Sequence, residues 1–156
     1  MTTIAWDGTT LAADSQSTAG SMICSLNDKK IIRPSHGESW SVGSVRALAV
    51  GMSGDCGVEE EFIDALKAGL TYKTELLEMS SFTAIIVTAK NACFLVFKDE
   101  GKKHAKICSH GGSYAVGSGG DIARSAMALG KTAQEAVHLA CELDVYSGGD
   151  VITFSI

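Results

Sequence analysis

The sequence predicts an α+β protein in which two antiparallel sheets are stacked and helices cover their outer faces. Many short segments alternate apolar and polar residues and are joined by tight turns, which is typical of antiparallel strands. The segments with helical periodicity come in separate blocks between these strands. A parallel sheet would instead alternate strands and helices one by one. Helices on both outer faces would cover every apolar face that the pattern predicts.

The composition indicates one soluble domain over residues 1–156 and excludes several classes of protein. The net charge is −5, and no Lys/Arg cluster exceeds a pair such as Lys102-Lys103, which argues against a nucleic-acid partner. No apolar run approaches the ~20 residues of a membrane span. The start also lacks the basic, apolar and cleavage regions of a signal peptide. We therefore expect a cytoplasmic protein with neither a nucleic-acid nor a membrane partner.

The cysteines and histidines show no metal-ligand spacing, so we expect no metal and no cofactor. No C-x-x-C pair occurs, and the five cysteines lie mostly among apolar residues. We expect them to be reduced core thiols: Cys24, Cys56, Cys93, Cys108 and Cys141. The run Ser118-Gly119-Gly120 at a helix start could cradle a phosphate, but it lacks the Gly-Lys-Ser/Thr of a P-loop.

The chain begins with a predicted hairpin. Strands over 2–6 and 9–14 flank Asp7-Gly8, a dipeptide that favours a tight turn because glycine adopts positive φ. We expect a loop over 15–20, and then strands over 22–25, 29–33, 40–42 and 46–51.

The first helix is expected to begin at Asp55, whose side chain can cap it, and to end at Gly69. Residues 59–61 are all glutamate, and negative charges near the start of a helix stabilise it because that end of the helix dipole is positive. The segment 70–81 is weakly patterned, and we expect one or two helical turns there.

The second half is expected to contain a meander of three strands, one further strand, two helices and a last strand. Thr132 and Glu135 form a capping-box pattern at the start of the second of these helices. The predicted strands span 82–88, 93–98, 103–109, 114–117 and 151–155, and the predicted helices run from 118–121 to 129 and over 133–143.

Thr2 is the first candidate functional residue. Its small side chain favours removal of Met1, which would leave Thr2 with both a hydroxyl and a free α-amine. An N-terminal amine is a recognised base for activating a threonine hydroxyl, and its unperturbed pKa of roughly 7.7–8.0 suits that task.

The sequence resembles the proteasome β subunits and the bacterial HslV-type peptidases, members of the N-terminal-nucleophile (Ntn) hydrolases. The resemblance rests on five segments in the family's order: TTIAWDGTTLAADSQSTAG, DKKII, AVGMSGD, AVGSGG and DVYSGGDV. It implies a four-layer αββα sandwich and a self-compartmentalising threonine endopeptidase with Thr2 as nucleophile.

The resemblance also implies a role for each matching residue. Lys30, rather than its neighbour Lys29, would lower the pKa of the Thr2 hydroxyl, and Asp14 would orient Lys30. The backbone N–H of Gly54, with Gly51 as a rival, would stabilise the oxyanion. Three residues would orient the amine and its water: Ser118, Asp144 and Ser147.

The substrate implied by the resemblance is an extended peptide or unfolded protein that pairs as an added strand near Thr18 and Gly54. The pocket for the residue before the cut would be lined by Ser17, Asp28, Ile32, Met52 and Cys56. Most of these residues are small or apolar, so we expect a neutral apolar side chain there, with a basic one as the alternative because of Asp28.

The segment 69–81 is far too short for the long second helix of this family, so the assembly is expected to differ. We expect a homo-oligomeric ring or spiral. An unfoldase ATPase is a candidate partner, provided that the altered assembly still offers it a docking face. No propeptide is expected beyond Met1. Two alternatives stay open: a non-proteolytic Ntn amidase and a catalytically idle scaffold subunit.

Overall fold

The computed structural model describes residues 1–156 and contains two main antiparallel sheets, two short hairpins and three helices. The first sheet has the order β12 (Tyr114–Gly117), β1 (Thr3–Trp6), β2 (Thr10–Ala13), β13 (Ile152–Ser155). The second has the order β11 (Lys106–Gly111), β10 (Ala92–Lys98), β9 (Phe82–Ala89), β8 (Ala49–Gly54), β5 (Ile31–Ile32). The hairpins are β3 (Ser17–Ala19) with β4 (Met22–Ser25) and β6 (Trp40–Val42) with β7 (Val45–Ala47).

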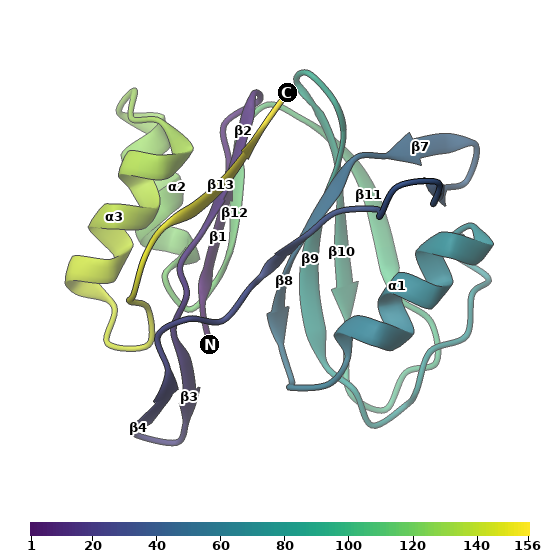
Figure 1. The fold of residues 1–156 in the computed structure, drawn as a ribbon, viewed down its shortest axis with the longest axis horizontal. Coiled ribbons are helices and arrows are strands. Elements are labelled where there is room, and N and C mark those ends of the chain that lie inside the picture. The colour runs from purple at the N-terminus through teal and green to yellow at the C-terminus, as the bar shows by residue number, and fades with distance from the viewer.

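The helices cover the outer faces of the two main sheets (Figure 1). Helices α2 (Gly120–Ala128) and α3 (Ala133–Leu143) pack on the first sheet, and α1 (Glu59–Ala68) packs on the far face of the second. The sheets face each other between them. The prediction of antiparallel sheets with separate blocks of helices is therefore confirmed.

Strand alternation explains how β1 serves two layers of the core. Ile4 and Trp6 point toward the second sheet, and Ala5 between them points toward α2 and α3. The layer under the helices consists mainly of alanines, whose small side chains let helix and sheet approach closely. The layer between the sheets holds larger side chains, with Trp6 and Leu11 fully buried.

Several predicted elements are wrong in detail. Residues 17–19 form β3 rather than part of a loop, and the predicted strand over 46–51 is divided into β7 and β8. Asp55 does not cap α1, because its carboxylate instead accepts the Ser81 N–H at 2.8 Å. The segment 70–81 forms no helix and contains only two isolated hydrogen-bonded turns, at 71–74 and 77–80.

The cysteines also differ from the expectation of a buried set. All five are free, but only Cys93 is buried, and Cys24, Cys56 and Cys108 are exposed. These residues lie at strand or loop positions that face outward, which apolar neighbours in the sequence do not reveal.

Candidate active site

The β1–β2 hairpin places Thr2 beside Asp14. Thr2 directly precedes β1 and Asp14 directly follows β2, so antiparallel pairing brings the two strand ends together. Both residues are almost fully buried, with 2% and 0% exposure. The Thr2 hydroxyl donates a hydrogen bond to Asp14 Oδ1.

The Asp14 carboxylate is an acceptor for five donors. Besides Thr2, Oδ1 accepts the Thr3 N–H at 3.0 Å and the Lys30 ammonium at 2.8 Å. Its other oxygen accepts the N–H groups of Gln16 at 3.2 Å and Gly148 at 3.0 Å. This full set of partners offsets the cost of burying a carboxylate.

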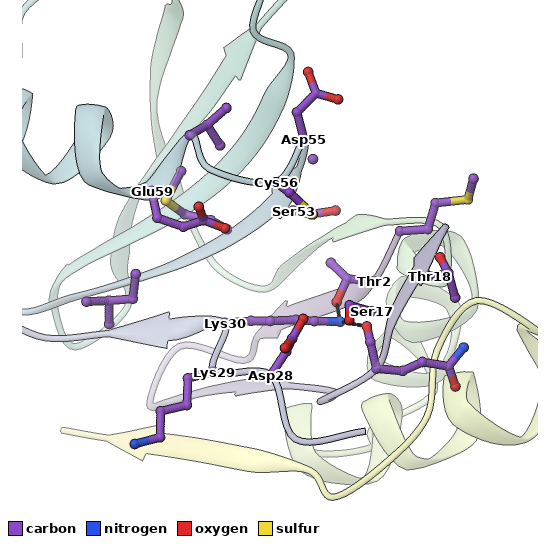
Figure 2. Close-up of a pocket in the computed structure, with 16 residues that line it drawn as sticks. Thr2, Ser17, Thr18, Asp28, Lys29, Lys30, Ser53, Asp55, Cys56 and Glu59 are labelled. Carbon is purple, nitrogen blue, oxygen red and sulfur yellow. Dashed lines mark hydrogen bonds between the residues drawn. The ribbon is translucent and has the colours of Figure 1, made fainter. Parts of the chain in front are cut away.

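Lys30 reaches this group from the residue before β5. An ammonium has three N–H donors, and those of Lys30 are matched by Thr2 Oγ1, Asp14 Oδ1 and the Gln16 carbonyl oxygen. Figure 2 shows Lys30 extending toward Thr2, whereas Lys29 points away from it. Of the two neighbouring lysines, Lys30 is the one in contact with the candidate nucleophile.

Strand β8 borders the site and presents a free backbone donor. The Met52 N–H donates to the Lys30 carbonyl on the β5 side, and the Asp55 N–H donates to the Ser81 carbonyl on the β9 side. N–H groups alternate in direction along a strand, so the Gly54 N–H shares the side of Met52 and lies beyond the end of β5. The N–H of Gly51 shares the β9 side and belongs to that ladder.

The position of Gly54 requires glycine. Its φ is +148°, and a Cβ there would lie 2.5 Å from both Phe82 Cα and the Ser81 carbonyl oxygen. Gly51 has a different role, because a Cβ there would lie 2.6 Å from Ile4 Cγ2 in the facing sheet. Gly54 is therefore the better placed of the two candidate oxyanion donors.

A second polar group lies on the helix side of Thr2. Ser118 precedes α2, and Asp144 and Ser147 follow α3. The hydroxyls of Ser118 and Ser147 donate to Asp144 Oδ2 at 2.6 and 2.7 Å. Ser118 Oγ is also 3.3 Å from the Thr2 carbonyl oxygen.

The pKa of Asp144 lies below its ordinary value of 3.8. Burial on its own would raise this pKa. Hydrogen bonds from Ser118, Ser147 and the Tyr146 N–H, together with the positive charge of the chain's N-terminus, outweigh that effect. Asp144 is therefore a negative charge close to the N-terminus at neutral pH.

The pKa of Cys141 on α3 is shifted by the charged residues of both polar groups. Burial of the thiol and the negative charge of Asp14 raise its pKa, Lys30 opposes the shift, and Asp144 adds to it, with a result of about 11. A thiol is a nucleophile only when it is deprotonated, so Cys141 is no rival to Thr2 at neutral pH.

A cavity of about 430 Å³ opens beside Thr2 and Lys30 (Figure 2). It is lined by all six residues that the sequence predicted for substrate binding, together with Gly54: Ser17, Thr18, Asp28, Ile32, Met52 and Cys56. The lining also includes Asp55 and Glu59, which the sequence did not single out for substrate binding; the Asp55 carboxylate itself is bonded to the Ser81 N–H. Met1 also lines this cavity. Because Met1 is still attached, the Thr2 nitrogen is a peptide amide in this structure.

Sequence reasoning missed two residues that complete the polar network. The Gln16 carbonyl binds Lys30, and the Thr3 hydroxyl lies 2.7 Å from Ser147 Oγ. A backbone carbonyl leaves no signal in a sequence, and Thr3 reads as an ordinary strand residue.

No three His, Cys, Asp or Glu side chains come together as a set of metal ligands. None of the helices is both long and apolar enough to cross a membrane.

No protein-family model and no curated protein matches the sequence. Among solved structures, Thiobacillus denitrificans BPH in complex with epoxomicin is similar, with a TM-score of 0.67 and 20% identity over 99% of this chain and 97% of that chain. Thiobacillus denitrificans BPH without the compound gives a TM-score of 0.66 and 21% identity over 99% and 96%. The chain shares their fold. Because the identities are low, the likeness concerns the fold alone.

Proposed function

We propose that this chain is a threonine peptidase of the Ntn-hydrolase type, with Thr2 as the nucleophile once Met1 is removed. The observation that carries the proposal is the Lys30 ammonium, which contacts both the Thr2 hydroxyl and the Asp14 carboxylate beside a cavity. A buried hydroxyl, lysine and aspartate in mutual contact are not required by the fold, whereas they suit an activated nucleophile.

In the proposed reaction, Thr2 Oγ1 attacks the scissile carbonyl carbon and its proton passes to the Thr2 α-amine, directly or through a water. The charge of Lys30 favours the developing alkoxide, and the Gly54 N–H binds the oxyanion of the tetrahedral intermediate. The resulting ammonium then protonates the leaving amine as the peptide bond breaks. Water hydrolyses the remaining ester by the same route and restores the Thr2 hydroxyl.

The fold supports this assignment. We interpret residues 1–156 as one domain with the four-layer αββα sandwich of the Ntn hydrolases. A protein of similar fold, Thiobacillus denitrificans BPH, was solved in complex with epoxomicin. Epoxomicin is a proteasome inhibitor, and proteasomes use an N-terminal threonine.

The substrate we propose is an extended peptide lying between β3 and β8, near Thr18 and Gly54. Glu59 lines the same cavity as Asp28, so two acidic residues border the proposed peptide. These charges favour a basic side chain over the neutral apolar one that the small lining residues suggested. Cleavage of a peptide library distinguishes the two.

We also propose that the chain works in the cytoplasm as a homo-oligomeric ring or spiral, which would keep folded proteins from the nucleophile. An unfoldase ATPase would be a partner only if that assembly offers it a docking face. Native mass spectrometry checks the first part: the mass should be a multiple of about 16.3 kDa, less Met1. A monomeric active enzyme would contradict it.

The test of the activity is labelling with an epoxyketone, followed by intact-mass measurement. Wild-type protein should have lost Met1 and should gain the mass of one inhibitor, whereas Thr2→Ala should gain none. Retention of Met1 in an active preparation would rule out Thr2 as the nucleophile.

Two alternatives predict other results. A catalytically idle scaffold subunit would not be labelled at all, although the contacts of Lys30 with Thr2 and Asp14 argue against it. A non-proteolytic amidase would be labelled but would cleave no member of the peptide library.

A further inference from the structure

Thr3 joins the two polar groups of the site through its backbone N–H and its hydroxyl. Thr3 is fully buried, and its backbone N–H donates to Asp14 Oδ1 at 3.0 Å. Its Oγ1 lies 2.7 Å from Ser147 Oγ in the other group. Thr3 is thus hydrogen-bonded to the nucleophile's aspartate on one side and to the serine that binds Asp144 on the other.

The direction of these hydrogen bonds follows from the number of protons. Ser147 has one hydroxyl proton and donates it to Asp144 Oδ2 at 2.7 Å. Asp144 also accepts the single proton of Ser118 at 2.6 Å. Ser147 Oγ can therefore only accept in its contact with Thr3, so the Thr3 hydroxyl is the donor. The order is Thr3 to Ser147 to Asp144.

Packing alone does not explain this hydroxyl. Gly119 approaches so closely that a Cβ there would collide with Thr3 Oγ1, so the backbone leaves little freedom around the side chain. A methyl group in place of the hydroxyl would fill a similar volume, but it would leave Ser147 Oγ without its donor. Thr3 differs from an ordinary strand threonine because its hydroxyl is buried and donates its proton to Ser147 Oγ.

We propose that Thr3 is a positioning residue for the reaction, acting through Ser147. Its donated proton fixes the rotamer of Ser147 and so holds the Ser147–Asp144–Ser118 group against the backbone of Thr2. In the mature enzyme this group then faces the α-amine in one arrangement. The proposal rests on the function proposed above, since it assigns Thr3 a part in that reaction.

Two substitutions at Thr3 separate the hydroxyl from the methyl group. Thr3→Val keeps the shape and should lower kcat about tenfold with KM within about twofold, the loss of one ordinary hydrogen bond. Thr3→Ser keeps the hydroxyl and should retain kcat within about threefold. Thr10→Val is the control, because it removes a threonine–serine contact at Ser155, 2.9 Å long, that is exposed and lies on the same sheet but away from the site.

A double-mutant cycle with Ser147→Ala tests whether Thr3 acts through Ser147. The double variant Thr3→Val/Ser147→Ala should be no slower than the Ser147→Ala single variant. Urea unfolding and circular dichroism establish that each protein is folded. Thr3→Ala, which adds no bulk, replaces the valine variant if that one does not fold.

Three results would overturn the proposal: full activity of Thr3→Val, an equal loss in Thr3→Ser, or additive losses in the cycle. Each of these leaves the proposed function intact as long as the wild-type protein is labelled by the epoxyketone. An unlabelled wild-type protein would overturn both.

Discussion

The ammonium group of Lys30 has three hydrogens and three acceptors, and one of the three acceptors is the candidate nucleophile. Its side chain is only 10% exposed, and that of Asp14 is fully buried. An ion pair shielded in this way is much less screened by solvent and salt than a pair on the surface. Lys30 is the cationic side chain in contact with both Thr2 and Asp14.

Lys30→Ala should lower kcat by about 10³-fold, because the Thr2 hydroxyl loses the charge that favours its ionisation. The fold should survive, with a loss of about 2 kcal/mol, since Asp14 keeps four other donors. Peptide hydrolysis and urea unfolding measure the two effects. Lys29→Ala is the control and should stay active; the reverse result would transfer the role to Lys29.

The depressed pKa of Asp144 makes a prediction about pH. A carboxylate whose pKa is lower in the folded protein stabilises the fold above its unfolded pKa of 3.8, and this stabilisation is lost as pH falls through the folded value. The difference in free energy of unfolding between wild type and Asp144→Asn should thus be largest above about pH 5 and narrow below 3.8. Urea titrations across this range check it, and parallel curves would contradict it.

At this scale the sequence predicted the residues of the site better than their connections. The structure brings Thr2, Asp14 and Lys30 into contact and places all six predicted substrate-binding residues around one cavity. Their roles remain predictions. The Gln16 carbonyl and the Thr3 hydroxyl were missed, because their partners lie 14 and 144 residues away and have no local pattern.

Among the elements, strand β12 limits how the chain can vary beside Thr2. It pairs with β1 in a register that sets Gly117 opposite Thr3. Gly117 has φ +94°, and a Cβ there would collide with the Thr2 carbonyl oxygen. Any larger residue must displace the backbone that carries the nucleophile.

Gly117→Ala should therefore reduce both stability and kcat, the latter by at least about tenfold for a small displacement of Thr2. Gly130→Ala is a close match, since its φ is +93° and nothing lies within 4 Å of the added Cβ. It should cost only the backbone strain of about 1–2 kcal/mol and leave kcat unchanged. Equal effects on kcat at the two positions would show that strain, not contact with Thr2, is responsible.

Features that depend on hydrogen bonds between residues near in sequence were predictable, and those that depend on partners far along the chain were not. The capping box of Thr132 and Glu135 is confirmed, because its donors and acceptors lie within four residues. The predicted cap at Asp55 is wrong because Ser81, 26 residues away, takes its carboxylate. Strand β3 was missed because its polar residues show no alternation, and its pairing with β4 decides its conformation.

At the scale of the whole molecule, the two main sheets pack closely where a small residue of one sheet faces a large residue of the other. Gly51 in β8 leaves room for Ile4 from the opposite sheet, and Leu11 lies beside it. The presence of glycine at 51 is therefore explained by packing between the sheets. It needs no part in the reaction.

Gly51→Ala should lower the free energy of unfolding by roughly 1–3 kcal/mol, because the new methyl group overpacks the interface against Ile4. Its kcat, measured where the protein is fully folded, should stay close to that of wild type. Urea unfolding and peptide hydrolysis on the same preparation decide the matter. A loss of kcat with unchanged stability would contradict this explanation, because it would tie position 51 to the reaction rather than to packing.

The two walls of the cavity differ in how much change they can absorb. One wall is β8, where the close approach of Phe82 and a positive φ exclude any residue but glycine at position 54. The other wall includes Ser17 and Thr18 on the β3–β4 hairpin, which projects from the body of the protein (Figure 1). Substitutions on the hairpin disturb little of the core. Substitutions in the hairpin, whether natural or engineered, can thus alter the choice of substrate while β8 keeps the Gly54 N–H in place beside Thr2.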